Sequence, residues 1–182
     1  GVTICEDIWN EPGLVRHGYA LDPVERMRGC DVVLNLSASP FHAGKGDVRV
    51  DLVRKQSRQA RAPLVYCNQV GGNDEIIFDG GSLVARPDGA IVHQGRQFEV
   101  EHSVVDINGP AVTPTHASFE AEVLDALVLG IDVLIAILFA TSLHFNQCLA
   151  NDSQGEPLWL PNPSKALSKV LDERIHFSEK LN

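Results

Sequence analysis

The chain has 182 residues, of which 44% are hydrophobic and 21% charged, a balance typical of a soluble globular domain with a real core. Its formal net charge of −9 argues against binding to a phosphate backbone, so we expect no nucleic-acid partner. The four cysteines show no paired spacing and the seven histidines are scattered, so we predict no metal site.

The sequence begins with Gly1 rather than Met and enters an apolar run at Val2. A natural protein rarely starts within a core strand, so we expect the N-terminus to be truncated. The sequence carries no recognisable signal peptide, which predicts a cytoplasmic location with reduced cysteines.

Residues 1–125 alternate between short apolar runs and helical patterns. Runs rich in β-branched residues predict strands at 2–5, 31–36, 63–70, 76–78, 82–85, 90–93 and 100–107. Helices are predicted between the first three strands, at 21–29 and 46–61. Such alternation is typical of a layered α/β domain, and the turn residues after position 80 predict a hairpin or meander. The basic residues of 46–61, Arg49 among them, are interpreted as a solvated helix face.

From about residue 118 to 145 the pattern becomes one apolar helix, whose segment 126–145 is just long enough to span a bilayer. Asp132 lies near the middle of that segment and no basic residues flank it. Both features argue against a membrane span, so we expect no membrane partner.

The sharpest local feature is an apolar strand that ends on Cys5, with Glu6 and Asp7 directly after it. The C-terminal end of a strand is where α/β proteins place reactive groups, and the N–H groups that follow can face a developing oxyanion. Because two carboxylates disfavour a neighbouring thiolate, a working nucleophile here needs a positive group or a base from elsewhere. A buried structural cysteine is the other interpretation of this local pattern.

Three segments extend the argument beyond Cys5. They read GVTICEDIW at 1–9, LNLSASPFHAGK at 34–45 and YCNQVGGNDEIIFDGGS at 66–82. In this order and spacing they resemble the carbon–nitrogen hydrolase (nitrilase) superfamily, and most of all the glutaminase domain of glutamine-dependent NAD synthetases. The resemblance implies an α/β fold, a partial αββα sandwich of the nitrilase type, followed by a mostly helical tail. It assigns 1–129 to the C-terminal half of a glutaminase domain and leaves 130–182 as an unassigned tail.

The resemblance implies a Glu–Lys–Cys triad with Cys5 as the nucleophile, and a glutamine pocket near Glu6, Trp9, Ser39 and Lys45. The residue types agree: Glu6 suits the substrate ammonium, Lys45 its carboxylate and Trp9 its apolar stem. In the family the glutamate and lysine precede the cysteine, and only four residues precede Cys5 here. We therefore expect neither to be present and the chain alone to be inactive.

The implied reaction releases ammonia from glutamine through a cysteine thioester, and a synthetase domain uses this ammonia to convert deamido-NAD to NAD. The amidase step needs no cofactor. ATP belongs to the synthetase domain, whose glycine-rich phosphate loop is missing after residues 130–132, so we predict no ATP binding. The implied partners are glutamine, the missing N-terminal half, the synthetase domain and, in the intact parent, further copies of the same protein.

Residues 131–182 resemble nothing that we can place, and a frameshift, a gene fusion or a wrongly joined reading frame would explain them. Two other functions stay open for the chain. One is an amidase or nitrilase of another substrate class, although Ser39 and Lys45 in their motif favour glutamine. The other is a non-catalytic remnant or association module, with unpaired strands and exposed core faces.

Overall fold

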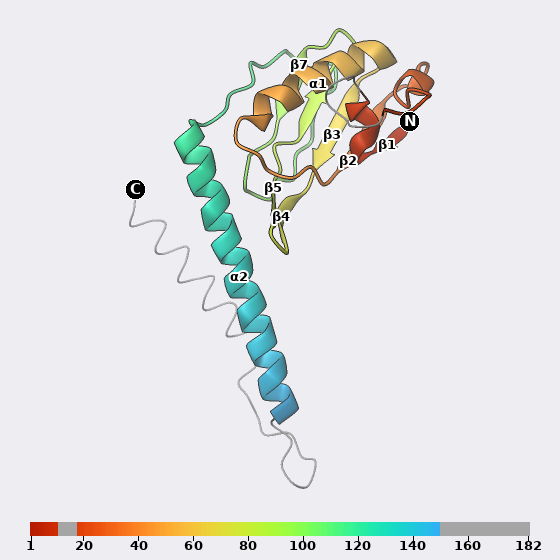
Figure 1. Cartoon of the computed structure of the whole chain (residues 1–182). Helices are drawn as coiled ribbons and strands as arrows, with labels where there is room; N and C mark the ends of the chain where they lie inside the picture. Colours follow the sequence, from red (N-terminus) through yellow and green to blue (C-terminus); the bar gives the residue numbers. More distant parts are fainter. Residues whose placement is uncertain (11–17, 150–182) are drawn as a thin grey trace. The chain divides into compact units, whose positions relative to one another are not determined.

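A computed structural model describes residues 1–10 and 18–149 of the chain (Figure 1). The chain divides into two units, Gly1–Val133 and Leu134–Asn182, and each is described by itself. The helices and strands are, in chain order, β1 (Val2–Ile4), η1 (Cys5–Trp9, a 3-10 helix), η2 (Glu25–Met27, also 3-10), β2 (Val33–Ser37), α1 (Lys45–Ala60), β3 (Leu64–Asn68), β4 (Val70–Asn73), β5 (Ile76–Asp79), β6 (Leu83–Ala85), β7 (Ile91–Gln94) and α2 (Phe119–Leu149).

The first unit is built on a five-stranded sheet in the order β1-β2-β3-β6-β7, beside a two-stranded hairpin of β4 and β5. Strands β1, β2 and β3 are parallel, and Ile4, Leu36 and Cys67 lie level across them. Strands β6 and β7 continue the sheet in antiparallel pairing. The carboxyl ends of the three parallel strands therefore meet at one edge of the sheet, where α/β proteins place their functional groups.

The sheet is covered on one face by α1 (Figure 1). Side chains alternate across strands, so β2 directs Val33 and Asn35 into the interior and leaves Leu34 and Leu36 exposed. The buried core includes Val53 and Ala60 of α1, and its members further along the chain are Ala62 and side chains of β3, β6 and β7. Apolar side chains on β1 and β2 are thus left without cover, which is the arrangement of one half of a sandwich.

Most predicted strands and the helix at 46–61 are confirmed, but two elements were predicted wrongly. Residues 21–29 form only η2, because the Asp22 carboxylate accepts the N–H groups of Val24 and Glu25 in a tight turn. Residues 101–106 form no strand, and the β-branched Val100 and Val104 are exposed instead of packed in the sheet. The run at 63–70 is also divided, since β3 ends at Asn68 and β4 starts at Val70.

Helix α2 confirms the apolar helix expected from about residue 118. Within the first unit, its buried residues are Glu122 and Ala126, while Leu124, Leu127 and Ile131 are exposed. Within the described ranges it is the one helix that is long and apolar enough, over Phe119–Ser142, to cross a membrane. Length and composition alone are weak evidence for a span, so the expected absence of a membrane partner stays a prediction.

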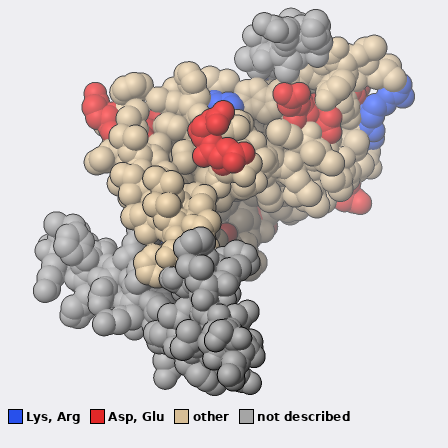
Figure 2. All heavy atoms as spheres, turned by 60° about the horizontal axis from the view of Figure 1, so that its bottom comes forward, with Lys and Arg blue, Asp and Glu red and all other residues tan. Residues whose placement is uncertain are grey.

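The expected boundary between 1–129 and 130–182 falls inside α2 and also stays a prediction. The part of the predicted tail from residue 150 lies outside the described residues. Figure 2 shows one face of the molecule, which is mostly neither acidic nor basic and carries small groups of acidic side chains with a few basic side chains among them. The absence of a nucleic-acid partner remains an expectation from the net charge.

Because α1 covers only one face of the sheet, we predict that truncating a leucine in the buried core destabilises the protein more than truncating a leucine on the open face. Leu64 is fully buried in β3, so Leu64→Ala should lower the free energy of unfolding by about 2–5 kcal/mol. Leu36 in β2 is 53% exposed, so Leu36→Ala should change it by less than about 0.5 kcal/mol. Urea unfolding of the 182-residue chain measures both values, and equal losses would contradict a sheet that is open on the Leu36 face.

Candidate active site

Cys5 lies where the chain leaves β1 and turns sharply into η1. Its φ is 44°, in the left-handed region that a residue with a Cβ seldom adopts. The turn is stabilised locally, because the Asp7 carboxylate accepts the N–H of Ile4 at 2.7 Å. Backbone strain of this kind is concentrated at functional sites, where the surrounding structure maintains it. The strand therefore presents a half-buried thiol at the functional edge of the sheet.

Three strand ends form a hollow around this thiol. The hollow has a volume of about 440 Å³ and is lined by Ile4, Cys5, Leu36, Ser37, Ala38, Cys67, Asn68 and Gln69. All of these residues come from the ends of β1, β2 and β3 or from the residues that directly follow them. The level register of the three strands is what brings them together.

A larger hollow of about 540 Å³ lies on the same sheet but does not include Cys5. Its walls come from β3, β6 and β7, from Val70, and from the segments 80–82, 95–96 and 99–105. The Glu101 carboxylate accepts a hydrogen bond from the N–H of Arg96 at 2.7 Å and lies 3.4 Å from His93 Nε2. These two contacts hold the segment 99–105 near β7. We place the candidate site at the smaller hollow, because the strained Cys5 lies there.

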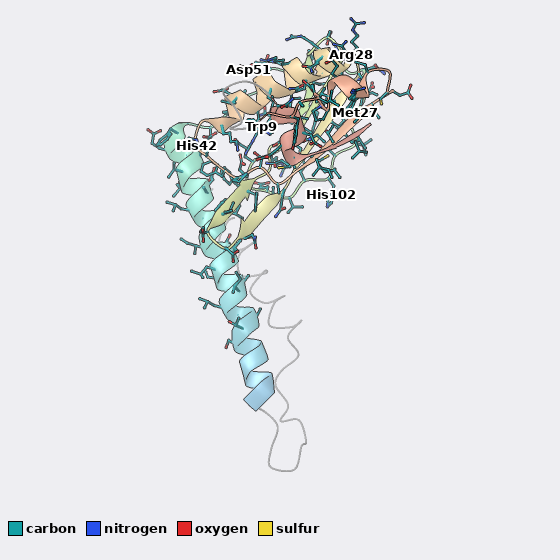
Figure 3. All side chains as sticks on the ribbon, turned by 45° about the vertical axis from the view of Figure 1, so that its right-hand side comes forward. Trp9, Met27, Arg28, His42, Asp51 and His102 are labelled. Atoms are coloured by element: carbon teal, nitrogen blue, oxygen red, sulfur yellow. The ribbon has the colours of Figure 1, made fainter. Side chains whose placement is uncertain are left out.

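Lys45 begins α1 close to Trp9, which lies beside this helix (Figure 3). The Lys45 ammonium is 5.1 Å from the centre of the Trp9 indole and donates to the carbonyl oxygen of Pro40 at 3.1 Å. Burial, and then the positive charge of Arg49, lower the pKa of Lys45, while Asp79 and Cys5 act in the opposite direction. A cation–π contact therefore holds Lys45 at Trp9, the last residue of the short helix that begins at Cys5.

The other residues predicted for the pocket lie in different surroundings. Ser39 is buried, and its N–H donates to Asn68 Oδ1 at 2.9 Å, which connects the residues after β2 to the end of β3. Glu6 is exposed in η1, and no hydrogen bond or ion pair among the described residues joins it to Trp9 or Lys45. The structure thus brings Cys5, Trp9 and Lys45 into one region, while Ser39 is buried and Glu6 is exposed.

The interpretation of Arg49 as part of a solvated face is wrong. Its guanidinium makes a two-pronged ion pair with Asp79 at the end of β5, with N–O distances of 2.6 and 2.7 Å. The two side chains are 3% and 2% exposed. Burial alone would lower the pKa of Arg49, but hydrogen bonding to Asp79 and the nearby negative charges more than offset burial and raise it. The physical reason for the error is that a guanidinium paired with a carboxylate through both terminal nitrogens can occupy the helix face that packs on the core.

One amino group of Arg49 also reaches the chain between β2 and α1. It donates to the carbonyl oxygens of Ser39 at 3.2 Å and Pro40 at 3.4 Å. At the other end of the same segment, Glu122 of α2 accepts the N–H of Gly44 at 3.1 Å, and the Glu122 side chain is buried. No sequence motif indicated these three hydrogen bonds. The one available signal was that Arg49 lies four residues from both Lys45 and the buried Val53, on the same face of the helix.

Comparison with known proteins agrees with this arrangement. The family model described as carbon–nitrogen hydrolase matches residues 1–117. Two similar relatives are glutamine-dependent NAD(+) synthetases: that of Synechocystis is 35% identical over 141 residues (72% of this chain and 25% of the relative), and that of Thermotoga maritima is 43% identical over 108 residues (59% and 18%). The chain thus spans about a quarter or less of these relatives.

A solved structure gives the same result. The glutamine-dependent NAD+ synthetase of Acinetobacter baumannii, in complex with ADP, is similar with a TM-score of 0.60 and 30% identity, over 75% of this chain and 26% of that one. The prediction of an α/β fold of the nitrilase type, and the resemblance on which it was based, are confirmed.

The lowered pKa of Lys45 predicts how stability changes at high pH. Between this pKa and the ordinary value of 10.5, the unfolded chain binds more protons at Lys45 than the folded chain does. The free energy of unfolding should therefore gain a contribution as pH rises across this window. Lys45→Met, as the control, should lack this contribution in urea unfolding measured at several pH values. A Lys45 side chain that titrates at or above 10.5 by NMR would contradict the described surroundings.

Proposed function

Because the chain belongs to the carbon–nitrogen hydrolase family, we propose that it is the cysteine-bearing part of a glutamine amidohydrolase domain that supplies ammonia for NAD synthesis from deamido-NAD. The observation that carries this proposal is Cys5, strained directly after β1 at the start of the short helix η1, whose last residue Trp9 contacts Lys45. The relatives named glutamine-dependent NAD(+) synthetase support the glutamine and NAD parts of the proposal.

In the proposed reaction, the Cys5 sulfur attacks the side-chain amide carbon of glutamine. Collapse of the tetrahedral intermediate breaks the C–N bond, and the amide nitrogen takes up a proton and leaves as ammonia. Water then attacks the remaining thioester, which releases glutamate and restores the thiol. In this proposal, the side chain of a catalytic glutamate residue transfers the protons and that of a lysine residue stabilises the oxyanion. Both residues belong to a part of the glutaminase domain outside these 182 residues. The chain by itself would then be inactive.

Lys45 is proposed to hold the substrate through its α-carboxylate. The ammonium is partly desolvated, and an ion pair with a carboxylate is stronger in such surroundings than in water. Trp9 lies under the same ammonium and offers an apolar wall for the substrate stem. Ser39 would shape the floor of the pocket, and the exposed Glu6 would meet the substrate ammonium at its rim. In this proposal the headgroup of glutamine lies at Lys45 and its side-chain amide points toward Cys5.

The remaining parts of the proposal concern cofactors and partners. The amidase step requires no cofactor, because protein side chains and water are sufficient for it. ATP would be used by a separate synthetase domain, and the A. baumannii synthetase was solved with ADP. Assembly into homo-oligomers and a cytoplasmic location remain proposals.

A second candidate function is supported by the open face of the sheet. The exposed apolar side chains of Val2, Ile4, Leu34 and Leu36 are suited to association with another sheet. A remnant that only associates would need this face but would not need the reactivity of Cys5. The two functions are therefore separated by experiments on Cys5 itself.

The nucleophile is tested by joining this chain to the preceding part of the T. maritima glutaminase domain. Ammonia release from glutamine should appear in the joined protein and be absent from the 182-residue chain alone. Cys5→Ala should lower kcat about a thousandfold or more, because the thioester cannot form. Cys67→Ala is the matched control, since Cys67 lines the same hollow but should leave kcat nearly unchanged. Equal loss in both variants, or none in Cys5→Ala, would sink the proposal.

Substrate class is tested in the same joined protein with Lys45→Met. Loss of one charge-assisted contact should raise KM for glutamine about ten- to a hundredfold. Hydrolysis of a simple aliphatic amide without a carboxylate should change little, because Lys45 has no partner on that substrate. Parallel loss on both substrates would argue for an amidase of another class.

A further inference from the structure

The segment 39–44, here called the pocket loop, connects β2 to α1 and contains no helix or strand of its own beyond an isolated bridge between Pro40 and Phe78. It nevertheless carries Ser39 and leads directly into Lys45, the first residue of α1. A loop is normally more mobile than the elements it connects, yet a binding group must be held within a fraction of an ångström to be effective. The contacts that fix this loop therefore determine the precision of the pocket.

Two buried charged side chains from outside the pocket loop hold its two ends. Arg49 of α1 donates to the carbonyl oxygens of Ser39 and Pro40, at 3.2 and 3.4 Å. Glu122 of α2 accepts the N–H of Gly44 at 3.1 Å, directly before Lys45. Between these ends, the Phe41 N–H donates to the carbonyl oxygen of Ile77 in β5 at 2.7 Å.

Asp79 fixes the guanidinium that holds the first end. It accepts from both terminal nitrogens of Arg49, and Gln97 donates to it at 3.2 Å. The nitrogen of Arg49 that bonds to Asp79 Oδ1 at 2.7 Å is the same one that reaches Ser39. Because the guanidinium is planar and rigid, it fixes the backbone of the pocket loop relative to Asp79 of β5. The flexible ammonium of a lysine would not do so.

Resting on the proposed function, we propose that Arg49 and Glu122 are positioning residues for glutamine recognition, and that Asp79 orients Arg49 in this role. The two side chains hold the ends of the pocket loop so that Lys45 stays at Trp9 and within reach of Cys5. The stability of the fold does not by itself require the buried charges of Arg49 and Glu122, because apolar side chains of similar volume often give a core of equal stability. What the buried charges add is directed bonds to the backbone of one loop.

The test uses the full 182-residue chain with the variants Arg49→Lys and Glu122→Ala. Arg54→Lys is the matched control, because Arg54 lies on the same helix but forms an exposed pair with Asp51. Hydrogen exchange followed by mass spectrometry should show amides of the pocket loop exchanging about tenfold faster or more in both variants. Exchange in β3 should change much less, and Arg54→Lys should leave both regions within about twofold of the parent.

A second readout connects the loop to glutamine. The rate of Cys5 alkylation is compared for a diazo-ketone analogue of glutamine and for iodoacetamide, which has no amino-acid headgroup. The preference for the analogue should fall about tenfold in Arg49→Lys and Glu122→Ala, while iodoacetamide reacts at the parent rate. Only a positioning role changes this ratio, since general loss of structure changes both rates.

The outcomes separate the inference from the function on which it rests. Faster exchange confined to the pocket loop, with a lower preference for the analogue, supports both. If the loop exchanges faster in the variants but the parent chain shows no preference for the analogue, loop positioning is supported. Its role in glutamine recognition and the proposed function are then overturned. The inference is overturned if loop exchange is unchanged in both variants, if it rises equally throughout the chain, or if the parent loop already exchanges like an unfolded peptide.

Discussion

The level register of three parallel strands is the constraint on which the site depends. Since β1, β2 and β3 pair with Ile4, Leu36 and Cys67 side by side, the residues after each strand emerge at one edge. Cys5 turns into η1 there, and the chain after β2 passes through Ser39 to the start of α1 at Lys45. A slip of one residue in β1 would turn its side chains to the opposite face and remove the thiol from this hollow.

The sheet has a covered face and an open one, and this asymmetry agrees with a chain that spans a quarter or less of its relatives. Helix α1 buries one face, while Ile4 and Leu36 remain exposed on the other. The proposed chemistry uses the edge between them. In the proposed function, a second sheet packed on the open face would bring the groups that stabilise the oxyanion and transfer protons to Cys5.

Local sequence signals predicted the elements that have a strong period or a sharp boundary. The strand that ends on Cys5, the helix at 46–61 and the apolar helix from residue 118 all have such signals, and all are present. The segment 100–107 has strand composition, but composition does not supply a neighbouring strand to pair with. The segment 21–29 has helix-boundary residues, but the Asp22 side chain competes for the backbone N–H groups that a helix would begin with.

The least predictable part of the candidate site was its polar interior. Arg49 has the composition of a surface residue, and its burial depends on Asp79, which lies 30 residues away in sequence. The contact between Glu122 and Gly44 spans 78 residues. Periodicity and spacing describe neighbours along one element, so they cannot identify partners that only the fold brings together. The motif segments pointed to Cys5, Glu6, Trp9, Ser39 and Lys45. The structure brings Lys45 to Trp9 and connects Ser39 to Asn68 at the hollow of Cys5, while Glu6 is exposed, and the roles of these residues stay predictions.

The central claim is that the Cys5 sulfur carries the acyl group of glutamine, and trapping that intermediate tests it most directly. The protein joined to the preceding part of a glutaminase domain would be quenched in acid during glutamine turnover, digested and analysed by mass spectrometry. The account predicts a glutamyl group on the peptide that contains Cys5, removable by hydroxylamine as a thioester should be. Ammonia release with no glutamyl group on Cys5, or with the group on Cys67, would contradict it.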